Sequence, residues 1–203
     1  MRRVISVRRL RRSTAVVATA FVLAVSIESA FATEAEKAPT ASATPEISEA
    51  ARKAYADSMR EARALLEQKK YDDAIARLDK LTAERPREPQ ARFLKAVALS
   101  DQKKNDEAIA AYRGLVADFP EMPEPHNNLA VLYAQKAELA LARDELLLAI
   151  STAPDYALAH ENLGDVYAQL AAEQYQRTID IDKRNKTAAV KLKTVRDAVQ
   201  AAP

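Results

Sequence analysis

The chain has 203 residues, a formal net charge of +2, no cysteine and only two glycines. The lack of cysteine excludes disulfides and thiolate metal sites, and Gly114 and Gly164 alone exclude a glycine-rich phosphate loop. Residues 1–32 hold six arginines and one glutamate, a net of +5, which leaves −3 for the rest of the chain. Because charges of both signs are interspersed there without a basic cluster, we expect no nucleic-acid partner.

Residues 1–32 have the pattern of a cleavable signal peptide. An arginine-rich start precedes an apolar, uncharged run from Thr14 to Ile27, and Ala30-Phe31-Ala32 offers a small-x-small cleavage site. The run is about 14 residues, short of the ~20 that a membrane span needs, so we expect membrane contact only through the uncleaved signal. The arginine-rich start resembles bacterial signals and predicts a periplasmic protein. Arg11-Arg12 leaves the twin-arginine route open beside the general secretory route.

Residues 33–44, rich in Ala, Thr, Pro and Glu, lack apolar periodicity and are interpreted as a flexible linker. Helical structure is expected over 45–201. Thr44-Pro45 resembles an N-cap followed by proline at the first helical position, which predicts a first helix over about 45–69.

A 34-residue period organises the middle of the chain in four registers. A small residue recurs in each of two predicted helices, where a larger one would push the crossing helices apart, and a proline then ends the second helix. The four series are Ala62, Ala96, Ala130 and Gly164; Leu65, Leu99, Tyr133 and Tyr167; Ala74, Ala108 and Ala142; and Pro86, Pro120 and Pro154.

This pattern resembles the tetratricopeptide repeat (TPR) family, with full repeats at about 55–88, 89–122 and 123–156. The segments that carry the resemblance include NDEAIAAYRGLVADFP (105–120), NNLAVLYAQ (127–135) and ENLGDVYAQ (161–169). The resemblance implies an all-α solenoid of helix-turn-helix repeats. Two departures stand out: the turns within repeats lack the usual glycine, and the expected early aromatic is replaced by Ser58, Arg92, His126 and His160.

The fourth repeat, 157–183, is contracted. The period places an alanine at 176, where Gln176 stands, and the best match is Ala171 followed by Tyr175. Five residues are therefore missing, which is the whole turn, and we predict one long helix from about Ala157 to Ile181. An amphipathic segment at 187–201 is expected to cap the solenoid, with binding of a partner helix as the alternative. The long helix either packs on the array or offers its distal half to a partner.

Catalytic, cofactor-binding and metal-binding residues are not assigned. His126 and His160 are one period apart, which leaves a metal-binding pair as an alternative. Packing is the favoured interpretation, because a metal site needs three or four convergent ligands. We therefore expect a non-enzymatic protein.

In TPR arrays the first helices line a concave groove, and the resemblance implies the groove residues here. They are Met59, Arg63, Leu66, Gln90, Phe93, Val97, Glu124, Asn127, Val131, Glu161 and Asp165. Such a groove is apolar in the middle and acidic toward its C-terminal end, which favours a peptide with an apolar anchor and a basic flank. The cationic clamp of the chaperone-binding members is not matched, since Asn127, Asn128 and Asn162 stand on that surface. Cover of the groove by the long helix is the alternative.

Three functional classes follow. The first is a non-catalytic periplasmic scaffold that binds a protein or peptide in the groove and serves a cell-envelope or secretion complex. The second is a homo-oligomeric structural protein that assembles through the long helix or the terminal helix. The third is a subunit of an enzyme whose catalytic residues belong to a partner.

Overall fold

The computed structural model describes residues 48–200, and these residues form helices and the short turns between them. The helices are α1 (Glu49–Glu67), α2 (Tyr71–Glu84), α3 (Pro89–Asp101), α4 (Asn105–Asp118), α5 (Pro123–Gln135), α6 (Leu139–Thr152), α7 (Ala157–Ile181) and α8 (Lys186–Gln200). The predicted signal peptide and linker, and the predicted helix start at 45, lie outside the described residues.

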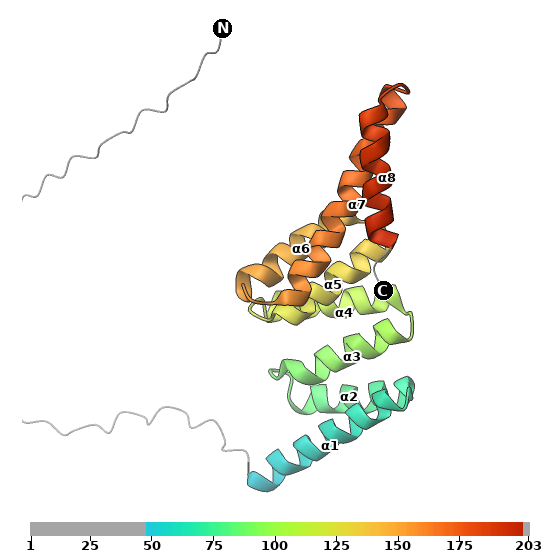
Figure 1. The fold of residues 1–203 in the computed structure, drawn as a ribbon. Helices are drawn as coiled ribbons and strands as arrows, with labels where there is room; N and C mark the ends of the chain where they lie inside the picture. The colour runs from blue at the N-terminus through green and yellow to red at the C-terminus, as the bar shows by residue number, and fades with distance from the viewer. Residues whose placement is uncertain (1–47, 201–203) are drawn as a thin grey trace, which may run out of the picture. The chain divides into compact units, whose positions relative to one another are not determined.

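Successive helices pack side by side in an α-solenoid (Figure 1). The pairs α1–α2, α3–α4 and α5–α6 form the three predicted full repeats, with a first and a second helix in each. The six alanines predicted at the helix crossings are all 0% exposed. Large side chains fill the space around them, and Leu78, Tyr112 and Leu146 on the second helices are at most 1% exposed. The crossings are therefore close-packed as the period predicts.

The turns within the repeats show how the chain reverses without glycine. Lys69, Lys103 and Ala137, one period apart, have φ of 58°, 61° and 58°. At the first of these turns Lys70 N–H donates to Leu65 O and Lys69 N–H donates to Leu66 O, both at 2.8 Å. The other two turns have the same pair of bonds. Each turn is a Schellman motif, which normally places glycine at this left-handed position. The fold thus holds three strained residues at equivalent sites.

Within the described residues, the first helix follows a serine cap. Ser48 is the N-cap of α1, and its hydroxyl accepts a hydrogen bond from Ala51 N–H at 3.2 Å. Helix α1 therefore starts at Glu49.

The prediction of a single long helix in the fourth repeat is confirmed, because α7 runs unbroken from Ala157 to Ile181. Its distal half continues beyond α5 and α6, and α8 lies along it (Figure 1). Arg196 Nη2 of α8 donates to Gln176 Oε1 at 3.2 Å, and the Lys191 ammonium lies 5.6 Å from the Tyr175 ring centre. Helix α8 thus packs along the distal half of α7.

None of the helices within residues 48–200 combines the length and the apolar character that crossing a membrane requires.

Candidate peptide-binding groove

The first helices α3, α5 and α7 present two neighbouring hollows. One, of about 240 Å³, lies between α3 and α5, and the other, of about 250 Å³, lies between α5 and α7. Val131 and Gln135 of α5 line both of them. The first hollow also includes Val97, Ser100, Asp101, Lys103, Tyr112, Asn128 and Leu132, and the second Ala130, Ala134, Leu146, Asn162, Asp165, Val166 and Gln169. The two hollows therefore form one groove across three repeats.

The groove residues repeat because the helices do. Val97, Val131 and Asp165 share one register of the period, and Asp101, Gln135 and Gln169 share another. These two rows are four residues apart, so on each helix they occupy one face. Val131 is 36% exposed although it is apolar, which gives the groove an aliphatic contact point between the two hollows. The amides on either side of it offer both hydrogen-bond donors and acceptors.

A chain of hydrogen bonds fixes the amides at the base of the groove. Asn162 Nδ2 of α7 donates to Asn127 Oδ1 at 2.8 Å, and Asn127 Nδ2 donates to Asn128 Oδ1 at 3.3 Å. Asn128 Nδ2 in turn donates to the Tyr112 hydroxyl at 3.1 Å. These hydrogen bonds join α4, α5 and α7, so they fix the relative positions of the helices that line both hollows.

The hydroxyl of Tyr112, at the end of this series of hydrogen bonds, has a raised pKa. Burial raises the pKa of Tyr112, and hydrogen bonds with Asn128 and Ser100 lower it by a smaller amount. The cause is desolvation, which disfavours the phenolate. Tyr112 therefore stays neutral and holds Asn128 throughout the physiological pH range.

Charge is unevenly distributed along this face. Asp101 and Asp165 lie in the hollows, and Lys103 is the cation among the residues that line them. Glu161 is exposed one turn before Asp165 on α7, whereas at the other end α1 carries the exposed Arg63. The hollow between α5 and α7 therefore carries one carboxylate, Asp165, and no cation among its lining residues.

The predicted groove residues divide into three groups. Val97, Val131 and Asp165 line the hollows. Arg63, Gln90, Glu124 and Glu161 are exposed, but they belong to neither hollow. The other four, Met59, Leu66, Phe93 and Asn127, are buried or partly buried.

Two of these four predictions are wrong. Met59 is 7% exposed in a core cluster with Ala91 of the next repeat, and Asn127 is 1% exposed beneath Asn162 of the next repeat. Their register packs against the following first helix and does not face a ligand. Phe93, in the same register, packs edge-on to Tyr112 with ring centres 6.1 Å apart. Phe93 is thus mainly a packing residue.

Sequence reasoning missed the polar residues one turn further along the helices. Asp101, Gln135 and Gln169 line the hollows, and their spacing of 34 was visible in the sequence. Each of these three residues lies four positions after a residue of the register that contains Val97 and Val131. That offset is the sequence signal that identifies them.

The two histidines have separate partners. His126 Nδ1 lies 2.6 Å from Glu145 Oε2 within the third repeat, and His126 is 4% exposed. His160 Nε2 lies 2.9 Å from the carbonyl oxygen of Pro154. Within residues 48–200 no three His, Cys, Asp or Glu side chains are grouped as a metal site would need. The described residues thus give no support to the alternative of a histidine metal pair.

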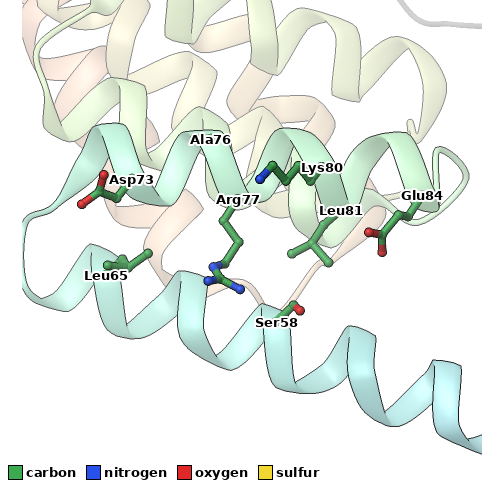
Figure 2. A pocket seen from close by; sticks show the side chains of 8 residues that line it. All are labelled: Ser58, Leu65, Asp73, Ala76, Arg77, Lys80, Leu81 and Glu84. Carbon is green, nitrogen blue, oxygen red and sulfur yellow. The ribbon is translucent and has the colours of Figure 1, made fainter.

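A further hollow, of about 460 Å³, lies between α1 and α2 (Figure 2). Its lining includes Ser58, which replaces an expected aromatic, together with Asp73, Arg77, Lys80 and Glu84. Arg77 forms an ion pair with Glu61 of α1 beside it. The hollow is the under-filled packing site of the first repeat. Because it is confined to one repeat and half of its lining residues are charged, it is a weaker candidate than the groove for binding a peptide.

The helix pairs, the buried alanine crossings and the 34-residue period define a helical-repeat protein. The family model described as tetratricopeptide repeat matches residues 59–123 and 98–157. The chain belongs to the tetratricopeptide repeat family. No curated protein matches it in sequence.

Solved structures with the same fold have low sequence identity to the chain. The first TPR domain of Spaghetti (RPAP3), bound to the HSP90 peptide SRMEEVD, is 20% identical with a TM-score of 0.54, over 58% of this chain and 93% of that one. The Yersinia enterocolitica type III secretion chaperone SycD, with a peptide of the translocator YopD, is 18% identical with a TM-score of 0.54, over 60% and 98%. PilF of Pseudomonas aeruginosa is 19% identical with a TM-score of 0.53, over 71% and 68%. At these identities the likeness concerns the fold.

Proposed function

We propose that this protein is a non-catalytic scaffold that binds a peptide or an extended segment of a partner protein in the groove of α3, α5 and α7. The observation that carries the proposal is the pair of hollows that share Val131 and Gln135. Two of the solved structures with this fold hold peptides, which supports the same use of the fold here.

The chemistry of the groove indicates what it binds. An aliphatic or aromatic side chain of the ligand fits beside Val131, where it removes apolar surface from water. The amides of Gln135, Asn162 and Gln169 are placed to bond the peptide backbone. Asp101 and Asp165 favour a ligand with a basic flank, because opposite charges steer and orient the partner.

The cellular setting belongs to the same proposal. The arginine-rich start and the apolar run of residues 1–32 support export to the bacterial periplasm. In that compartment a peptide-binding scaffold serves a cell-envelope or secretion complex.

A pair of matched variants tests the groove. Val131→Glu places a charge between the two hollows, and Leu141→Glu places the same charge on α6, at a residue that is 48% exposed and lines neither hollow. We expect the wild-type protein and Leu141→Glu to capture the same proteins from a periplasmic extract, and Val131→Glu to lose them. Equal capture by all three proteins, with unchanged helical circular dichroism, contradicts the proposal.

A further inference from the structure

Helix α7 contains both helices of the fourth repeat, fused end to end. Its C-terminus has the geometry of a second helix: Asp182 N–H donates to Thr178 O at 2.8 Å, as Phe119 N–H donates to Leu115 O at 2.8 Å after α4. The next turn also matches, with Asn185 N–H bonded to Asp182 O at 3.1 Å and Met122 N–H to Phe119 O at 3.2 Å. The fourth repeat therefore lacks only the five residues of the turn, and its second helix is intact.

Helix α8 then takes the place of the first helix of a fifth repeat. Its cap, Asn185, corresponds to Tyr156 before α7. Ala188 and Leu192 are three and seven residues beyond this cap, as Ala159 and Leu163 are beyond Tyr156, and all four are at most 8% exposed. Helix α8 thus packs on the distal half of α7 as a first helix packs on the preceding second helix.

Because the two helices of the fourth repeat are fused, they do not pack against each other. In the third repeat, Ala130 and Tyr133 of the first helix are 0% and 8% exposed because Ala142 and Leu146 of the second helix cover them. The corresponding Tyr167 is 48% exposed, and a Cβ added to Gly164 would meet no atom within 4 Å. A straight helix cannot fold its second half back over its first half.

Both halves of that contact lie on one face of α7. Gly164 and Tyr167 belong to the first half, and the second half contributes the counterparts of Ala142 and Leu146. We call this face the α7 stripe, and its residues are Gly164, Tyr167, Ala171, Tyr175 and Thr178. Their spacing of three or four residues places them on one side of a helix. The stripe is uncharged over four turns, whereas α7 has five charged residues on its other faces, namely Glu161, Asp165, Glu173, Arg177 and Asp180.

We propose that the α7 stripe binds the α7 stripe of a second copy of this chain, antiparallel, so that each copy supplies the second helix that covers the first helix of the other. The stripe is self-complementary, because the two halves are the two sides of one intra-repeat contact. A two-fold axis brings Gly164 of the first copy against Ala171 of the second, and Ala171 of the first against Gly164 of the second. A two-fold interface requires this reciprocity. Loss of a turn between two packed elements is a recognised route to such an exchange.

The exchange leaves the groove available. Asn162, Asp165 and Gln169, which line the hollow between α5 and α7, are not part of the stripe. The dimer therefore presents two grooves, and its formation is independent of peptide binding.

Solution mass is the first test. Light scattering during size-exclusion chromatography is expected to give twice the mass of one chain, and Tyr167→Lys is expected to halve it with unchanged helical circular dichroism. A single-chain mass for the wild-type protein at every concentration overturns the proposal.

Paired cysteines test the register, since the chain has no cysteine of its own. In Gly164→Cys/Ala171→Cys the two positions are seven residues apart, or ~10.5 Å along the helix. This exceeds the ~7 Å within which two Cα atoms can be bridged, so a disulfide forms only between chains. We expect oxidation to give covalent dimers. The matched control, Glu173→Cys/Asp180→Cys, has the same spacing at exposed residues of the opposite face and is expected to stay largely uncrosslinked. Equal crosslinking of both variants refutes this register.

Restoring the turn is the most specific test. A copy of residues 102–106, inserted between Gln169 and Leu170, supplies the five residues that the period lacks. The second helix is then expected to fold back within its own chain and convert the dimer to a monomer. Persistence of the dimer after this insertion contradicts helix exchange. The groove variants at Val131 test peptide binding separately, so the two proposals can fail independently.

Discussion

Replacing Lys69 by glycine is expected to stabilise the protein. Lys69 follows the C-cap of α1 with a φ of 58°, and its side chain is exposed. A left-handed conformation costs an L-residue about 1–2 kcal/mol, a cost that glycine does not have. Glycine also gives the unfolded chain more freedom, which opposes this gain by about 0.5–1 kcal/mol. The net effect of Lys69→Gly on the free energy of unfolding is an increase of about 0–1.5 kcal/mol, with a midpoint of about 0.75 kcal/mol.

The neighbouring residue provides the control. Gln68 is also exposed, but its φ is −78°, so glycine there relieves no strain and only adds freedom to the unfolded chain. Gln68→Gly is expected to lower the free energy of unfolding by about 0.5–1 kcal/mol. For a chain of this size, 1 kcal/mol corresponds to about 2–4 °C in Tm. Thermal unfolding followed by circular dichroism measures both variants, and a lower Tm for Lys69→Gly than for the wild-type protein refutes the reasoning.

Three further predictions concern the core. Ala142→Leu should lower the free energy of unfolding by about 1–3 kcal/mol because it overfills a crossing that is 0% exposed, whereas the exposed Ala140→Leu should have little effect in the same thermal assay. Leu146→Ala should cost about 2–5 kcal/mol in chemical unfolding, and Leu148→Ala, at a 48% exposed residue, less than about 0.5 kcal/mol. Because the folded pKa of Tyr112 is raised, the unfolded state loses this proton first, so stability should fall as the pH rises above about 10. Phenolate absorbance should show that Tyr112 ionises at a higher pH in the folded protein than in the unfolded protein.

The fold was largely predictable because the 34-residue period indicates which residues pack against one another. The alanine and proline registers located the helix pairs, and the five residues missing before Ala171 located the long helix with bounds that the structure reproduces. The left-handed conformations of Lys69, Lys103 and Ala137 were not predictable, since a turn without glycine is compatible with several conformations.

The groove was predictable only in part, because two neighbouring registers of the first helix differ by a small rotation. Residue 127 precedes residue 131 by four positions, which is 40° more than a full turn. That rotation points Asn127 at the following repeat, where Asn162 covers it, and leaves Val131 exposed. Glu161 of the same register is exposed on α7, where no regular fifth repeat follows. The neighbours of each repeat, which periodicity alone does not describe, therefore decide which residues are free to bind.

The most direct test of the groove is site-specific photo-crosslinking in living cells. A photo-crosslinking amino acid introduced at Val131, between the two hollows, is expected to form a discrete adduct with a partner protein. The same amino acid at Leu141, which is more exposed but lies in neither hollow, is expected to form none. The same adduct from both positions, or an adduct from Leu141 alone, contradicts the assignment of the groove as the binding surface.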